Sequence, residues 1–124
     1  MGNMQFNLKR MLADWLPASA QVPVKYWSDQ VRGYVEPEMR LLKHLVRKGD
    51  RVIDIGGNRG VYAYHCCKLG AVVEVFEPNP VCLQVLEPWS HGRPGITLHP
   101  VALSDHAGTA ELHIPVDAQG VEHD

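Results

Sequence analysis

Residues 51–60, RVIDIGGNRG, and residues 71–80, AVVEVFEPNP, decide the fold of this chain. Each stretch is a short apolar run that ends in an acidic residue, Asp54 or Glu77, before residues that break regular structure. Apolar runs of this length between Gly, Pro and Asn are typical of strands. The order strand, glycine-rich loop, helix, strand and acid predicts a nucleoside-cofactor site.

The composition indicates one globular domain. The chain has 124 residues, of which 45% are hydrophobic and 21% charged, and its net charge is −2. We expect no nucleic-acid partner, because such proteins usually present a basic face. We also expect no membrane span, because no apolar run reaches about 20 residues. Lys9 and Arg10 precede only two apolar residues, so the N-terminus does not resemble a signal peptide and we predict a cytoplasmic protein.

We divide the chain into residues 1–34 and residues 35–124. In the first part, apolar residues at helical spacing predict an amphipathic helix over residues 4–16. Residues 17–34 show no clear period and are interpreted as a connecting segment. Its aromatic residues either line the mouth of a pocket or, as we favour, pin the segment to the domain. They are Tyr26, Trp27 and Tyr34.

Residues 35–124 alternate between helix and strand patterns, and the apolar run of residues 71–76 predicts a strand covered on both faces. Asn79-Pro80 is a helix-start signal, and Pro88 should end that helix early. The predicted elements are a helix over 36–48, a strand over 51–55, a helix over 61–69, a strand over 71–76, a helix from 80 and a loop over 91–95.

The last predicted elements are a third strand over residues 96–104 and a hairpin partner over residues 109–114. Pro100 inside the third strand indicates an edge strand or a break. Strands that alternate with helices predict a parallel sheet with crossover connections. The fold class is therefore α/β, a partial doubly wound (Rossmann-like) fold with parallel strands, crossover helices and a C-terminal hairpin.

The loop after the first strand has the spacing D-x-G-x-N-x-G. A dinucleotide fingerprint starting at Gly56 would need glycines where Asn58 and Val61 stand, so a nicotinamide cofactor fits poorly. Glycines in this turn allow a ligand to approach bare backbone. Asn58 is also one of the few other residues that tolerate the left-handed region.

Each polar residue beside this loop has two interpretations. Asp54 can meet a cationic or amino group of a ligand, or cap the loop's own amides. The carboxylate of Glu77 can accept hydrogen bonds from both ribose hydroxyls, or lie solvated at the strand end. Asn79 is first a helix cap and only second a ligand contact.

The segments VIDIGGNRGVYAYHCCKLGAVVEVFEPNP and ITLHPVALSDHAGTAELHIP together resemble the FkbM-type methyltransferases, within the class I S-adenosylmethionine-dependent superfamily. The resemblance runs from about Val35 to Val116. It implies a methyltransferase fold, S-adenosylmethionine as cofactor and O-methylation of a hydroxyl on a sugar or natural product. It implies a cofactor site made of Asp54, Gly56, Gly57, Asn58, Gly60, Glu77, Asn79 and Ser104, with Glu77 on the ribose and Ser104 near the adenine.

Such methyltransferases have a larger sheet, and this sequence stops at Asp124 before its second half. We therefore expect an incomplete domain that carries the cofactor half-site, lacks an evident catalytic base and is inactive by itself. Three alternatives remain: a fragment, a remnant or association module that pairs through its exposed sheet edge, and a fragment of a nicotinamide-dependent oxidoreductase.

The cysteines and histidines do not predict a metal site. Cys66, Cys67 and Cys82 are too few for a disulfide framework and fit a reduced, half-buried helix face. His99, His106 and His113 are evenly spaced but fall on a strand, a turn and a strand. We interpret the histidines as ordinary surface residues.

Overall fold

The computed structural model describes residues 15–116. Helices and strands follow one another as α2 (Ala18–Arg32), α3 (Met39–Leu45), β1 (Arg51–Ile55), α4 (Val61–Lys68), β2 (Val72–Phe76), α5 (Pro80–Ser90) and β3 (Ile96–His99). The helix predicted over residues 4–16 lies, apart from its last two residues, outside the described part of the chain.

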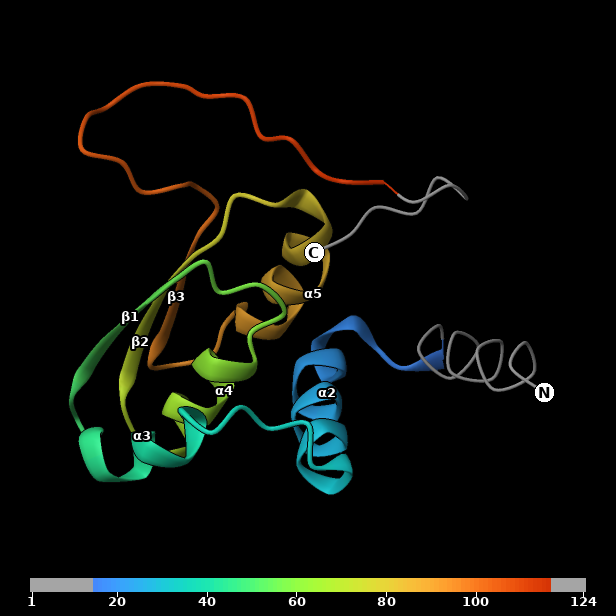
Figure 1. Ribbon diagram of the computed structural model, residues 1–124, viewed down its shortest axis with the longest axis vertical. Coiled ribbons are helices and arrows are strands. Elements are labelled where there is room, and N and C mark those ends of the chain that lie inside the picture. Colours follow the sequence, from blue (N-terminus) through green and yellow to red (C-terminus); the bar gives the residue numbers. More distant parts are fainter. Residues whose placement is uncertain (1–14, 117–124) are drawn as a thin grey trace.

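The three strands form one parallel sheet in the order β1-β2-β3, with β2 in the centre. Helices α4 and α5 connect successive strands, as crossover helices must when parallel strands are neighbours. Asp54 pairs in register with Val75, and Val75 with Leu98, so the carboxyl ends of all three strands meet at one edge (Figure 1). The predicted α/β, Rossmann-like class is confirmed.

Helices cover one face of this sheet. Val73 and Val75 of β2 have 0% exposure and belong to the core, together with Leu86 and Trp89 of α5. On the opposite face Ile53 is 61% and Ile55 66% exposed, and Figure 1 shows α2, α4 and α5 together on the other side. Val72 of β2 is also 43% exposed, so the prediction that the strand at 71–76 is covered on both faces was wrong. Side chains of a strand alternate between the two faces, and one face has no described helix over it.

The segment interpreted as a connection is the helix α2, so that prediction was wrong. Val22 and Tyr26 lie four residues apart on one face of α2 and are 1% and 4% exposed. That face packs against α4 and α5. Pro23 lies inside the helix and obscured its period in the sequence, while Gly33, with φ 73°, ends it in the left-handed conformation.

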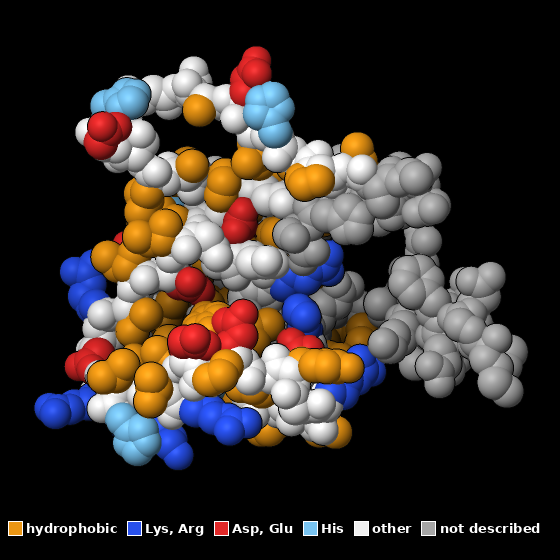
Figure 2. Space-filling view, viewed as in Figure 1, with side chains coloured by type: hydrophobic (Ala, Val, Ile, Leu, Met, Phe, Trp, Pro, Cys, Tyr) orange, Lys and Arg blue, Asp and Glu red, His pale blue; other side chains and the backbone are white. Residues whose placement is uncertain are grey.

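The predicted C-terminal hairpin is absent from the described residues. β3 ends at His99, directly before Pro100, and residues 101–115 carry no strand. They form an exposed arm, residues 101–116, that leaves the sheet and carries histidine and acidic side chains (Figure 2). Pro100 has no amide proton to extend the ladder, and both predictions made from it are confirmed: β3 is an edge strand of the described sheet, and it ends directly before Pro100.

Two helices also differ from their predicted bounds. α3 begins at Met39 rather than Glu36, because residues 37 and 38 form a turn. α5 continues through Pro88 to Ser90, although Pro88 was expected to end it. Pro88 has no amide proton, so the carbonyl of Gln84, four residues earlier, lacks its usual helical hydrogen bond. Gln84 is exposed, so water can donate to this carbonyl instead and the helix can continue.

Among residues 15–116, no helix combines the length and the apolar character needed to cross a membrane.

Candidate functional site

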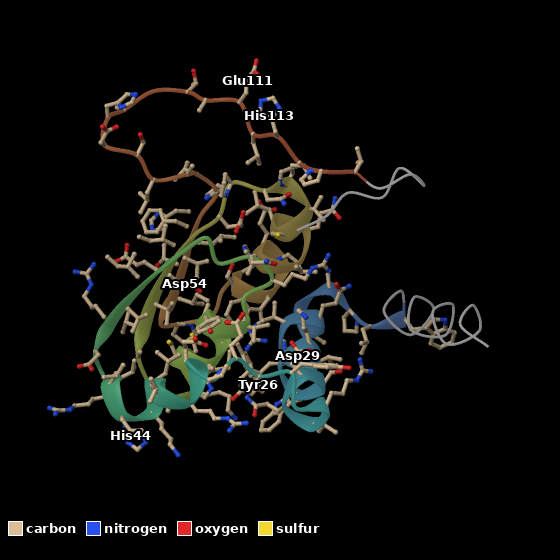
Figure 3. All side chains as sticks on the ribbon, in the orientation of Figure 1. Tyr26, Asp29, His44, Asp54, Glu111 and His113 are labelled. Atoms are coloured by element: carbon tan, nitrogen blue, oxygen red, sulfur yellow. The ribbon has the colours of Figure 1, made fainter. Side chains whose placement is uncertain are left out.

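A pocket of about 590 Å³ lies at the carboxyl end of β1. The glycine loop forms one wall, and α2 with the following connection, residues 33–38, forms the other. Figure 3 shows Tyr26 and Asp29 on α2, and Asp54 from β1. The lining residues are Lys25, Tyr26, Asp29, Gln30, Tyr34, Val35, Glu36, Met39, Asp54, Gly56, Gly57, Asn58, Arg59, Val61 and Tyr62.

The glycine loop has a fixed shape that presents backbone to this pocket. The amides of Gly56 and Gly57 both donate to the carbonyl of Phe76, at 2.8 and 3.2 Å. Gly56 has φ 74°, and a Cβ built there would meet no atom within 4 Å. A Cβ at Gly57 would lie 2.3 Å from Cγ1 of Val75. Gly57 is therefore needed for packing, and Gly56 leaves open space beside the pocket.

Asp54 presents a polar atom that has no partner in the described structure. Its Oδ2 is buried and accepts no hydrogen bond from any described residue. Burial raises the pKa of the Asp54 carboxyl, the backbone hydrogen bond from Ala63 lowers it, and the nearby charge of Glu77 raises it. An unpaired buried carboxylate oxygen is costly unless a ligand donor reaches it.

Glu77 lies beneath the loop and is 6% exposed. Its Oε2 accepts the amide proton of Asn58 at 2.7 Å, and its Oε1 accepts that of Asn79, also at 2.7 Å. The solvated strand-end alternative is therefore wrong for Glu77. Contact with a ribose stays a prediction.

Four of the eight predicted site residues line the pocket: Asp54, Gly56, Gly57 and Asn58. The other four do not. Gly60 precedes α4, where a Cβ would lie 2.8 Å from Leu86. Asn79 caps α5, its Oδ1 accepting the amide proton of Val81 at 2.9 Å, as its first interpretation predicted. Ser104 lies in the exposed arm, and its hydroxyl donates to Asp105.

The pocket is also lined by residues that the sequence pattern did not single out. The hydroxyl of Tyr62, near the start of α4, donates to Oε2 of Glu36 in the connection. This hydrogen bond raises the pKa of Tyr62 to about 12, with burial and nearby carboxylates adding to it. On α2, Lys25 and Asp29 form an ion pair at 3.2 Å. Tyr62 could have been noticed because it follows the loop directly, whereas nothing in the sequence linked Glu36 to it.

The aromatic residues of the segment 17–34 both line the pocket and pin the segment to the domain. Tyr26 lines the pocket and also packs against α4, where its hydroxyl and Nδ1 of His65 are 2.7 Å apart. Tyr34 lines the pocket and is 74% exposed. Trp27 lies outside this pocket, with the ammonium of Lys68 over its ring at 4.3 Å.

Within residues 15–116, no three His, Cys, Asp or Glu side chains lie close enough together to hold a metal ion. Cys66, Cys67 and Cys82 form no disulfide bond. Burial raises the pKa of the Cys66 thiol to about 11, so it is a weak nucleophile at neutral pH.

Comparison with known proteins finds only a partial structural similarity. No family profile matches the chain, and no curated protein matches it. A solved structure named as a methyltransferase from an antibiotic biosynthesis pathway of Anabaena variabilis superimposes with a TM-score of 0.43 at 23% identity. The match covers 52% of this chain and 25% of that one. We therefore argue the function of this chain from its own residues.

Proposed function

We propose that this chain binds S-adenosylmethionine at the glycine loop and serves methyl transfer to a hydroxyl of a sugar or natural product. The observation that carries the proposal is the buried, unpartnered Oδ2 of Asp54 at the edge of a pocket walled by bare glycine backbone. The D-x-G-x-N-x-G spacing and its resemblance to FkbM-type methyltransferases add support. Three cysteines without a disulfide bond suit our proposal of a reducing, cytoplasmic location.

The carboxylate of Asp54 suits the methionine end of that cofactor. Asp54 would accept from its ammonium group, because an ionised carboxylate is an acceptor only and its Oδ2 lacks a donor. A charge-assisted hydrogen bond of this kind is roughly twice as strong as a neutral one. The same interaction would offset the cost of keeping Asp54 buried.

The backbone of the loop would exclude water and approach the ligand closely. Gly56 leaves open space where any other residue would place a Cβ, and its φ of 74° strains non-glycine residues. Bound S-adenosylmethionine supplies an electrophilic methyl group on a sulfonium. The walls of the pocket position this ligand, which is the larger part of what methyl transfer requires of a protein.

Isothermal titration of the whole chain with S-adenosylhomocysteine and with NAD tests the proposal. We expect S-adenosylhomocysteine to bind with a Kd in roughly the micromolar range, about −8 kcal/mol, and NAD to bind far more weakly. Asp54→Asn should weaken the binding, whereas Asp105→Asn, which removes an exposed carboxylate of the arm, should not. Equal affinity for NAD, or no binding of either compound, would contradict the proposal.

A second candidate function is association. Two observations favour it: β1 and β3 are the edge strands of the sheet formed by residues 15–116, and the uncovered face of that sheet exposes Ile53, Ile55 and Val72. Open edges pair readily with other strands. We propose self-association through the edge of β1, which sedimentation velocity over a concentration series would detect. A single monomeric species at every concentration would exclude it.

A further inference from the structure

Glu77 is the buried acid of the described core, and both of its oxygens already hold backbone amides. The side chain is 6% exposed. Oε2 accepts from the amide of Asn58 in the glycine loop, and Oε1 from that of Asn79 before α5, each at 2.7 Å. Because an ionised carboxylate has only acceptors, two amide protons suit it as partners. Distances of 2.7 Å are at the short end of charge-assisted hydrogen bonds.

Asn58 is held in an unusual conformation. Its φ of 48° makes it the one non-glycine residue with positive φ among residues 15–116. Its side chain is held as well, since Oδ1 accepts from Sγ of Cys82 on α5 at 3.7 Å. A left-handed residue without glycine's freedom persists only where its surroundings fix it. Here Glu77 and Cys82 provide that constraint from beneath the loop.

The same carboxylate also reaches the start of α5. Asn79, whose amide Glu77 accepts, uses its own side chain to cap the helix at Val81. The glycine loop and the first turn of α5 are therefore joined through one buried side chain. Asn58, unlike Glu77, lines the pocket.

We propose that Glu77 is a positioning residue: it fixes the left-handed conformation of Asn58, and so the pocket wall, through its bond to the Asn58 amide. It acts on a ligand through the loop. Direct contact between Glu77 and ribose hydroxyls is the competing outcome. The effect on the loop does not depend on the ligand, whereas the effect on affinity rests on the proposed binding of S-adenosylmethionine.

The loop is tested without ligand, by NMR on the whole chain. In the wild type we expect a scalar coupling across the hydrogen bond from the Asn58 amide nitrogen to the Glu77 carboxyl carbon. Glu77→Gln places an NH₂ group against one of the two amides, so Asn58 or Asn79 should exchange its amide proton at least about tenfold faster, a loss of roughly 1.4 kcal/mol in protection.

Glu74→Gln is the matched control, because Glu74 lies three positions earlier on β2 but on the uncovered face, paired with Arg51. It should leave both amides unchanged, and Val73 and Val75 should stay protected in both variants. Absence of the coupling in the wild type, or unchanged exchange in Glu77→Gln, would overturn the proposal. Absence of the coupling in the wild type overturns the proposal even where the variant does not fold.

The ligand arm uses S-adenosylhomocysteine and its 2′,3′-dideoxyribose analogue. A positioning role predicts that Glu77→Gln weakens both compounds by the same factor. A direct ribose contact predicts loss for S-adenosylhomocysteine alone, which would overturn the proposal for the ligand. If neither compound binds the wild-type chain, the proposed function fails, while the NMR result still decides what Glu77 does to the loop.

Discussion

Asp54 and Glu74 lie on opposite faces of the same sheet, and the pKa values of their carboxyl groups shift in opposite directions. Asp54 shares the helix-covered face with Val52, and burial raises its pKa. Glu74 lies on the uncovered face, where hydrogen bonds from Arg51 and His99 lower its pKa. On the covered face, next to the pocket, burial destabilises the ionised form of Asp54. On the uncovered face, the carboxylate of Glu74 is already paired.

The two carboxyl groups differ in whether a hydrogen-bond partner is already present. A buried group without a partner marks a place where a ligand can supply one, whereas a paired surface group needs nothing more. Glu74 forms an ion pair with Arg51 and approaches Nε2 of His99 at 3.2 Å. The carboxyl end of the covered face is therefore the better candidate for chemistry.

The largest expected difference between the faces is in stability. Leu86→Ala should lower the free energy of unfolding by about 2–5 kcal/mol, because Leu86 is 0% exposed in the core. Ile53→Ala should change it by less than about 0.5 kcal/mol, since Ile53 is 61% exposed. Urea denaturation of both variants measures the difference. Similar losses would show that something covers Ile53 in solution.

Gly57→Ala should disturb the loop from the covered side. Its Cβ would lie 2.3 Å from Cγ1 of Val75, so we expect a loss of about 1–3 kcal/mol in unfolding free energy and weaker binding of S-adenosylhomocysteine. The double variant with Val75→Ala removes the clashing methyl group and should recover part of the affinity. Calorimetric titration checks this, and independent, additive losses would contradict the steric explanation.

Asp54→Asn should weaken binding of S-adenosylhomocysteine by about 10- to 100-fold, the size expected for a hydrogen bond to a charged group. It should also stabilise the free protein at pH 7. Because burial raises the pKa of Asp54 above 3.8, the folded state binds the proton more tightly than the unfolded state does. Stability therefore falls as pH rises from 3.8 through the folded-state pKa.

Denaturation of wild type and Asp54→Asn over a pH series would show that fall in the wild type alone. A variant that is less stable than the wild type at pH 7 would mean that the ionised carboxylate has a partner in solution.

The smallest effect concerns Glu74. Its lowered folded-state pKa means that its contribution to stability is present above pH 4.5 and is lost as pH falls through that folded value. Glu74 is partly exposed, with a side-chain exposure of 25%, and salt screens its ion pair, so we expect Glu74→Gln to change stability little. NMR titration of the side-chain carboxyls should place Glu74 below 4.5 and Asp54 above 3.8. The reverse order of shifts would remove the contrast between the faces.

Local sequence was sufficient to predict features that depend only on neighbouring residues. The strands at 51–55 and 72–76, the cap at Asn79 and the positive φ of Asn58 were all predictable from residue type and spacing. It failed where proline hides a helical period, as in α2, and where alternation suggested a strand in the arm. A strand needs a partner, and alternation of apolar residues does not provide one.

For the site, the sequence by itself determined where the glycine loop and the acids Asp54 and Glu77 lie, because all of them are found at the carboxyl ends of strands that residue type and spacing predict. Only the tertiary structure decided that Asp54 keeps an unpartnered oxygen, that Glu77 turns under the loop, and that Glu36 reaches Tyr62 across the pocket. Those outcomes depend on which amides and side chains meet after α2, α4 and α5 pack on one face of the sheet. Residue spacing along the chain does not predict these tertiary contacts.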